Sequence, residues 1–110
     1  MRILLDQGTP VAIGQGLQGH LVRTAYAQGW STLTNGELLR VAEEAGFDLL
    51  LTTDTNLPHQ QNIRGRKLAL VILSKNRWTL IQRSMNEIVA AVNSAKPGAY
   101  RVVDIPETQR

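Results

Sequence analysis

The sequence predicts an α/β domain built around a parallel sheet, and three observations lead to this prediction. Short apolar runs, typical of buried strands, alternate with segments whose apolar residues recur at helical spacing. The runs are continuously apolar, as expected of parallel strands covered on both faces. Turn-forming or polar residues directly follow most of them. We therefore expect a three-layer fold with a central parallel sheet of four to five strands flanked by helices.

The expected elements follow one another without a linker or an internal repeat. In chain order they are a strand at 3–5, a helix at 10–17, a strand at 20–24, a turn at 25–30, a helix from about 37 to 45, a strand at 47–53, a strand at 67–73, a helix at 78–95 and a strand at 100–105. Residues 1–105 therefore form one domain, and residues 106–110 form a C-terminal tail.

The first helix is predicted from its start signals. Thr9 can cap a helix whose first residue is Pro10, where the missing N–H is no loss. Gly14 and Gly16 weaken this helix.

The later elements have stronger signals. Thr34 precedes a run of apolar residues at helical spacing, and Gly46 ends that helix. The apolar strand after it ends at Asp54. Inward-facing apolar residues recur along 78–95, and Lys96-Pro97-Gly98 ends that helix.

Composition excludes several classes of protein. At 110 residues the chain has the size of one domain, and with no cysteine it has neither disulfides nor thiolate metal sites. Only two histidines are present, so any metal should be held mainly by oxygen. The N-terminus opens directly into the first strand, without a basic leader or a long apolar run. We expect a cytoplasmic protein with no membrane partner.

The net charge of +3 suggests a polyanionic partner, although such a surplus is also common on proteins that bind none. Six of the twelve cations fall between residues 64 and 83. Arg64, Arg66 and Lys67 follow the acidic middle of the chain, and we expect them to lie beside the acidic edge of the sheet and to contact a phosphate backbone. A solvated charge run is an equal alternative for these three.

Two aspartates directly follow predicted strands. Ligands of open parallel sheets bind beyond the carboxyl ends of the strands, and Asp6 and Asp54 both occupy that position. Repulsion between two such carboxylates is relieved by a divalent cation, and Mg²⁺ or Mn²⁺ takes carboxylate and water oxygens. This pattern favours phosphodiester chemistry. Each aspartate alone also suits a turn.

Other acids are less clearly placed. Glu37 lies three residues after Thr34, so a capping box explains it as well as a metal site does. Asp48 begins its strand and should lie at the opposite end of the sheet from Asp54, roughly 20 Å away.

Three motifs in this order resemble the short PIN-like domains found as the toxin half of bacterial toxin–antitoxin pairs. The motifs are Leu4-Leu5-Asp6-Gln7-Gly8-Thr9-Pro10, Asn35-Gly36-Glu37-Leu38-Leu39 continuing to Gly46, and Leu50-Leu51-Thr52-Thr53-Asp54. The resemblance implies a PIN-type fold and a metal-dependent ribonuclease that hydrolyses RNA and is inhibited by an antitoxin protein. It assigns Asp6, Glu37 and Asp54 as the catalytic and Mg²⁺- or Mn²⁺-binding residues.

The chain departs from the family pattern at two positions. Asn56 stands where a further acid is often found, and Gln7 stands where some relatives have glutamate. Together with Asn35 these amides would support a site of three carboxylates, which should bind a divalent ion more weakly than an acidic quartet does.

Two alternatives from other functional classes remain open. A receiver-like signalling domain also has an aspartate after its third strand, but here only Asp6 follows the first strand and no lysine follows Asp104. A PIN-like binding module that has lost catalysis would act through an antitoxin, through nucleic acid or as a homodimer.

Overall fold

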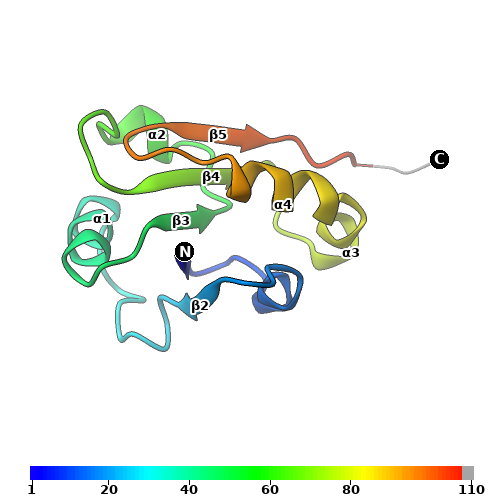
Figure 1. Ribbon diagram of the computed structural model, residues 1–110, viewed down its shortest axis with the longest axis horizontal. Helices are drawn as coiled ribbons and strands as arrows, with labels where there is room; N and C mark the ends of the chain where they lie inside the picture. Colours follow the sequence, from blue (N-terminus) through cyan, green and yellow to red (C-terminus); the bar gives the residue numbers. More distant parts are fainter. Residues whose placement is uncertain (108–110) are drawn as a thin grey trace.

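The computed structural model describes residues 1–107 and contains one five-stranded sheet. The strands are β1 (Arg2–Leu5), β2 (Leu21–Thr24), β3 (Leu49–Thr52), β4 (Ala69–Leu73) and β5 (Tyr100–Val103). They lie in the order β2-β1-β3-β4-β5, and every neighbouring pair is parallel (Figure 1). The predicted α/β class with a parallel sheet is confirmed.

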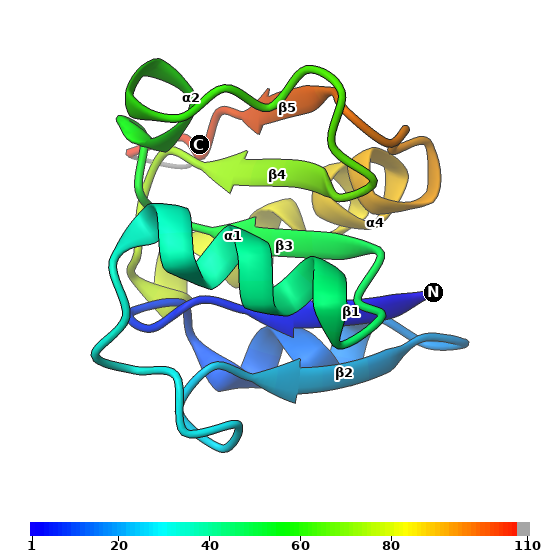
Figure 2. The same cartoon turned by 90° about the vertical axis from the view of Figure 1, so that its left-hand side faces the viewer.

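Helical segments cover both faces of the sheet. They are η1 (Val11–Gly16), α1 (Asn35–Glu44), α2 (Leu57–Gln60), α3 (Trp78–Ile81), η2 (Gln82–Ser84) and α4 (Met85–Asn93). Apolar side chains of η1, α3 and α4 form one core cluster with one face, and those of α1 and α2 form a second cluster with the other. Figure 2 shows α1 in front of the sheet and α4 behind it. The chain therefore has three layers, which explains why the three central strands β1, β3 and β4 are mostly apolar and buried.

Two predicted helices differ from the structure. The segment expected as a helix over 10–17 is the 3₁₀ helix η1, which contains Gly14 and ends at Gly16. Gly16 packs against the end of the Met85 side chain of α4. The helix expected over 78–95 breaks at Ser84, which is buried and adopts φ −114° and ψ 19°, outside the α-helical region.

The structure also contains a helix, α2, between the strands predicted at 47–53 and 67–73, where the sequence predicts none. α2 has Pro58 in its first turn, where proline is favourable, and buries Leu57 against the sheet. The C-terminal tail was expected over 106–110, of which residues 108–110 lie outside the described part of the chain.

The crossover from β4 to β5 is left-handed. The steps from β3 to β4 and from β4 to β5 run in the same direction across the sheet, but α2 lies on the α1 face while α3 and α4 lie on the opposite face (Figure 2). The two crossovers therefore have opposite hands, whereas about 98% of such connections are right-handed. As a result, α4 leaves β5 uncovered on the α1 face.

The strand order creates one topological switch point. The chain steps from β1 outward to β2 and then returns past β1 to β3. The β1–β2 connection, which contains η1, lies on one face of the sheet, and the β2–β3 connection, which contains α1, lies on the other. In sheets of this order the ligand crevice opens at the carboxyl ends of those two strands. Asp6 and Asp54 follow β1 and β3 there.

Among residues 1–107, none of the helices has both the length and the apolar character needed to cross a bilayer.

Candidate functional site

The two aspartates are connected through one buried threonine. Leu5 pairs with Leu51 in the β1–β3 register, so Asp6 lies level with Thr52, the last residue of β3. The Thr52 hydroxyl donates to Asp6 Oδ2 at 2.7 Å and accepts from the Asp54 backbone N–H at 3.0 Å. Thr52 is fully buried, which fixes this connection between the strand ends.

Asp54 accepts hydrogen bonds from the first residues of α1 and α2. Asn35, the first residue of α1, donates its side-chain amide to Asp54 Oδ2 at 3.0 Å. The Asn56 backbone N–H donates to Asp54 Oδ1 at 3.0 Å, and Leu57 N–H donates to the Asp54 carbonyl at 3.2 Å. The start of α1 and the start of α2 therefore both meet the end of β3 at this carboxylate.

Burial raises the pKa of Asp6 above its ordinary value. Hydrogen bonds from the Thr52 hydroxyl and the Gln7 backbone N–H lower this pKa, and the negative charge of Asp54 adds to the rise. None of the ion pairs within residues 1–107 includes Asp6 or Asp54. A positive charge near Asp6 would therefore stabilise its ionised form.

The donor set fits a hard cation. Each of the four carboxylate oxygens of Asp6 and Asp54 accepts one hydrogen bond from the chain, so each keeps lone-pair capacity for a metal. Mg²⁺ is commonly bound by one or two carboxylates, with water and substrate phosphate completing its shell. Across residues 1–107 no group of three or more His, Cys, Asp or Glu side chains could hold a metal ion. The candidate site is therefore a two-carboxylate site.

Glu37 forms a capping box at the start of α1. Its Oε1 accepts from the Thr34 backbone N–H at 3.1 Å and from the Thr34 hydroxyl at 2.9 Å, and its own N–H donates to that hydroxyl. The Thr34 backbone N–H, and next its hydroxyl, lower the pKa of Glu37. Glu37 is exposed, and the structure brings it into no three-acid group with Asp6 and Asp54.

The supporting amides act in different ways. Asn35 contributes its side chain to Asp54, whereas Gln7 and Asn56 contribute their backbone N–H groups. The side chains of Gln7 and Asn56 are exposed.

The expectation that the basic run lies beside the acidic edge is wrong. Residues 64–67 precede β4 and therefore lie at the amino ends of the strands, opposite Asp6 and Asp54. Arg66 pairs with Glu43 at 2.6 Å, and the Lys67 backbone N–H donates to the same carboxylate at 2.7 Å. Arg64 remains exposed. Asp48 also lies at the amino edge, as expected, and accepts from the Arg2 N–H at 2.8 Å.

A small hollow of about 210 Å³ opens beside Asp6. Tyr26 and Val11 on its rim are 77% and 67% exposed, which is unusual for large apolar side chains of this protein. Its other lining residues are Leu5, Asp6, Gln7, Gly8, Thr9 and Thr24. An aromatic or apolar group next to a phosphate at Asp6 could enter this hollow.

Two residues of the site escaped the sequence-based prediction. Thr52 had a detectable signal, because a hydroxyl at the end of an apolar strand lies level with Asp6 once the two strands are aligned. Tyr26 had none, since it was expected only within a turn and its nearness to Asp6 depends on how β2 pairs with β1.

Comparisons with protein-family models, with curated proteins and with solved structures found no match to this chain.

Proposed function

We propose that this chain is a metal-dependent ribonuclease in which Asp6 and Asp54 bind Mg²⁺ or Mn²⁺ beside the scissile phosphate. The supporting observation is the Asp6–Thr52–Asp54 connection at the switch point of the sheet. Two carboxylates, one with a raised pKa, share a crevice in which parallel sheets bind their ligands. This combination is typical of phosphoryl chemistry with a divalent cation.

The proposed roles of the residues follow from their hydrogen bonds. Thr52 holds Asp6 Oδ2 and Asn35 holds Asp54 Oδ2, so neither carboxylate needs to reorient when a cation arrives. When bound, the ion would supply charge neutralisation for the phosphate and lower the pKa of a coordinated water.

RNA as substrate and an antitoxin as partner come from the resemblance to PIN-like toxins. The net charge of +3 favours a polyanionic ligand over a neutral one. In this proposal the antitoxin would inhibit cleavage by covering the carboxyl edge of the sheet, where Asp6 and Asp54 lie.

The test is cleavage of a mixed-sequence single-stranded RNA with Mn²⁺ or Mg²⁺, with and without EDTA. We expect cleavage by the wild type to stop with EDTA and to fall at least about 100-fold in Asp6→Asn and Asp54→Asn, since the lost charge stabilisation is worth several kcal/mol. Glu44→Gln removes the same charge from an exposed position of α1 and serves as the control. Equal cleavage in all four proteins would reject the proposal.

A non-catalytic binding module is the second candidate. The observation that favours it is the two-carboxylate site, with Asn56 where a further acid is often found. RNA binding that is unchanged by Asp6→Asn, together with no metal-dependent cleavage, would select this alternative.

A further inference from the structure

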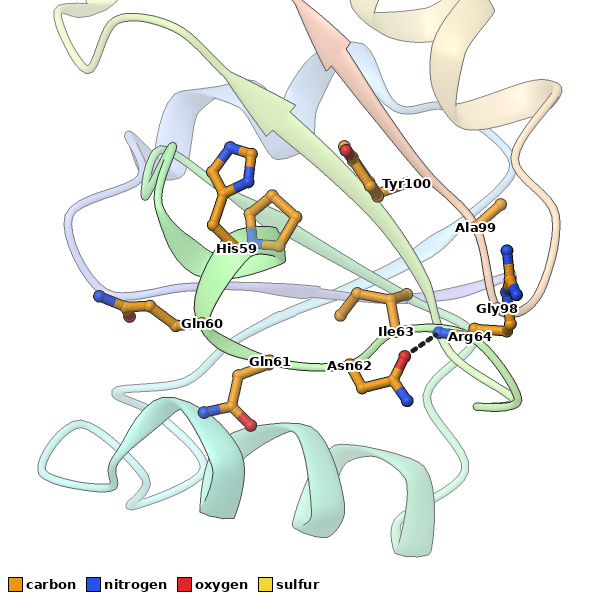
Figure 3. Close-up of a pocket in the computed structure, with 10 residues that line it drawn as sticks. His59, Gln60, Gln61, Asn62, Ile63, Arg64, Gly98, Ala99 and Tyr100 are labelled. Carbon is orange, nitrogen blue, oxygen red and sulfur yellow. Dashed lines mark hydrogen bonds between the residues drawn. The ribbon is translucent and has the colours of Figure 1, made fainter.

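A second hollow lies on the α1 face of the sheet, over β5. It has a volume of about 600 Å³ and is formed by α2, the segment that follows it and the start of β5. Its polar and aromatic lining comprises His59, Gln60, Gln61, Asn62, Arg64 and Tyr100. Figure 3 shows His59 and Tyr100 toward one end and Arg64 beside Gly98 toward the other.

The left-handed β4–β5 crossover explains why this hollow exists. Tyr100 and Val102 are register partners of Leu70 and Ile72, and parallel partners point to the same face of a sheet. Leu70 and Ile72 are buried, but Tyr100 and Val102 are 49% and 52% exposed. With α4 on the opposite face, β5 is approached from this side by the four-residue α2 and by the segment that follows it.

Close backbone packing forms the far end of the hollow. Gly98 has φ +75°, and a side chain there would lie 3.3 Å from the backbone of Gly65 and of Arg66. The turn before β5 therefore lies directly against the 63–66 segment. Arg64 projects from this segment, and its N–H donates to Asn62 Oδ1 at 3.1 Å.

The chemistry of the lining points to one class of ligand. The hollow contains a guanidinium, an imidazole, an exposed aromatic ring and side-chain amides, but none of the nine carboxylate residues of the chain. Guanidinium groups bind phosphate, aromatic rings stack on bases of any sequence, and amides hydrogen-bond to base edges. A single-stranded nucleic acid uses all three groups at once, whereas an acidic peptide without aromatic residues has no ring to stack on Tyr100.

We infer that this hollow is a second contact site for single-stranded RNA, with a base stacked on Tyr100 and a phosphate bound by Arg64. The inference rests on the proposed RNA substrate. It identifies a second surface, separate from Asp6 and Asp54, that binds this RNA. α2 links the two sites, because α2 begins at the Asp54 turn and its His59 lines the hollow.

The test measures binding of a short fluorescein-labelled single-stranded RNA to the full chain by fluorescence anisotropy, in EDTA so that no cleavage occurs. We expect Tyr100→Ala to weaken binding at least about fivefold, as loss of one stacked base does, and Tyr100→Phe to bind like the wild type. Arg64→Gln should weaken binding and reduce the slope of log affinity against log salt by about 0.7. Arg83→Gln, the same charge change on η2 at the opposite face, is the control.

Several results would overturn the inference. Wild-type affinity in both Tyr100→Ala and Arg64→Gln would do so, as would an equal loss in Arg83→Gln. Displacement of the RNA by polyglutamate as efficiently as by unlabelled RNA would identify an acidic-peptide site instead. Arg64 lies in an exposed loop, so its variant tests the site even if Tyr100→Ala unfolds. Normal binding without metal-dependent cleavage would reject the ribonuclease proposal and leave this inference standing.

Discussion

The Thr52 hydroxyl donates to Asp6 Oδ2 at 2.7 Å and thereby joins the ends of β1 and β3 by a side-chain hydrogen bond. The same oxygen accepts from the Asp54 N–H at 3.0 Å, so one buried group holds both the Asp6 carboxylate and the chain that carries Asp54. Through Asn35 this connection reaches the first turn of α1. The positions of the two carboxylates are therefore set by the sheet register and by one helix start.

Replacing Thr52 by valine should cost stability as well as function. Thr52→Val leaves the Asp54 N–H unpaired and removes a donor from Asp6, which should lower the free energy of unfolding by roughly 1–3 kcal/mol. Urea unfolding measures this change. Thr52→Ser keeps the hydroxyl and should lose less than Thr52→Val; an equal loss in both would show that the hydroxyl contributes nothing.

The raised pKa of Asp6 gives a signed pH dependence. A carboxyl group whose pKa is raised on folding stabilises the protein fully below its unfolded value of about 3.8, and this contribution is lost as pH rises through the folded pKa. We therefore expect the stability of Asp6→Asn relative to the wild type to increase from about pH 4 to about pH 7. Urea unfolding of both proteins across this range checks it, and a flat or falling difference would contradict the assignment.

A cation bound by both aspartates should stabilise the fold. Mn²⁺ that binds only the native state raises the free energy of unfolding by about 2.7 kcal/mol at a hundred times its Kd. Thermal unfolding with increasing Mn²⁺ should show a rising Tm for the wild type and for Glu44→Gln. Asp54→Asn should show little or no rise, because half of the carboxylate set is gone. An equal rise in Asp54→Asn would place the ion elsewhere.

The substitution Glu37→Gln distinguishes a capping role of Glu37 from a metal-binding role. Glu37→Gln removes the charge but retains a side chain able to complete the capping box, so its stability should stay close to that of the wild type. Glu37→Ala cannot complete the box and should be less stable than Glu37→Gln. Because Glu37 belongs to no three-acid group in the structure, we expect Glu37→Gln to keep cleavage within about threefold. A much larger loss of cleavage would place Glu37 at the metal, as the family resemblance implies.

The hollow beside Asp6 should contribute to substrate binding. Tyr26 is 77% exposed on its rim, so we expect Tyr26→Ala to raise KM for RNA at least about fivefold with a smaller effect on kcat. Tyr26→Phe retains the ring and should behave like the wild type. Steady-state cleavage kinetics measure both constants, and an unchanged KM in Tyr26→Ala would exclude this contact.

The sequence alone determined the fold class and the placement of the two aspartates. Continuous apolar runs identify strands buried on both faces, and an acid directly after such a run must lie at the carboxyl edge if the sheet is parallel. The capping box of Thr34 and Glu37 was also predictable, because it depends only on residues three apart in one chain segment. These features are local, so short-range chemistry is enough to identify them.

Only the tertiary structure decided which residues surround the two aspartates and where the cations lie. Thr52, Asn35 and Tyr26 meet the acids through strand register and helix placement, which are contacts between segments distant in sequence. Residues 64–67 lie at the amino edge of the sheet because they precede β4, and Arg66 forms an ion pair with Glu43 of α1. The hand of the β4–β5 crossover, which exposes Tyr100, has no signal in local spacing, because the apolar stripe of a helix does not indicate which face of the sheet the helix covers.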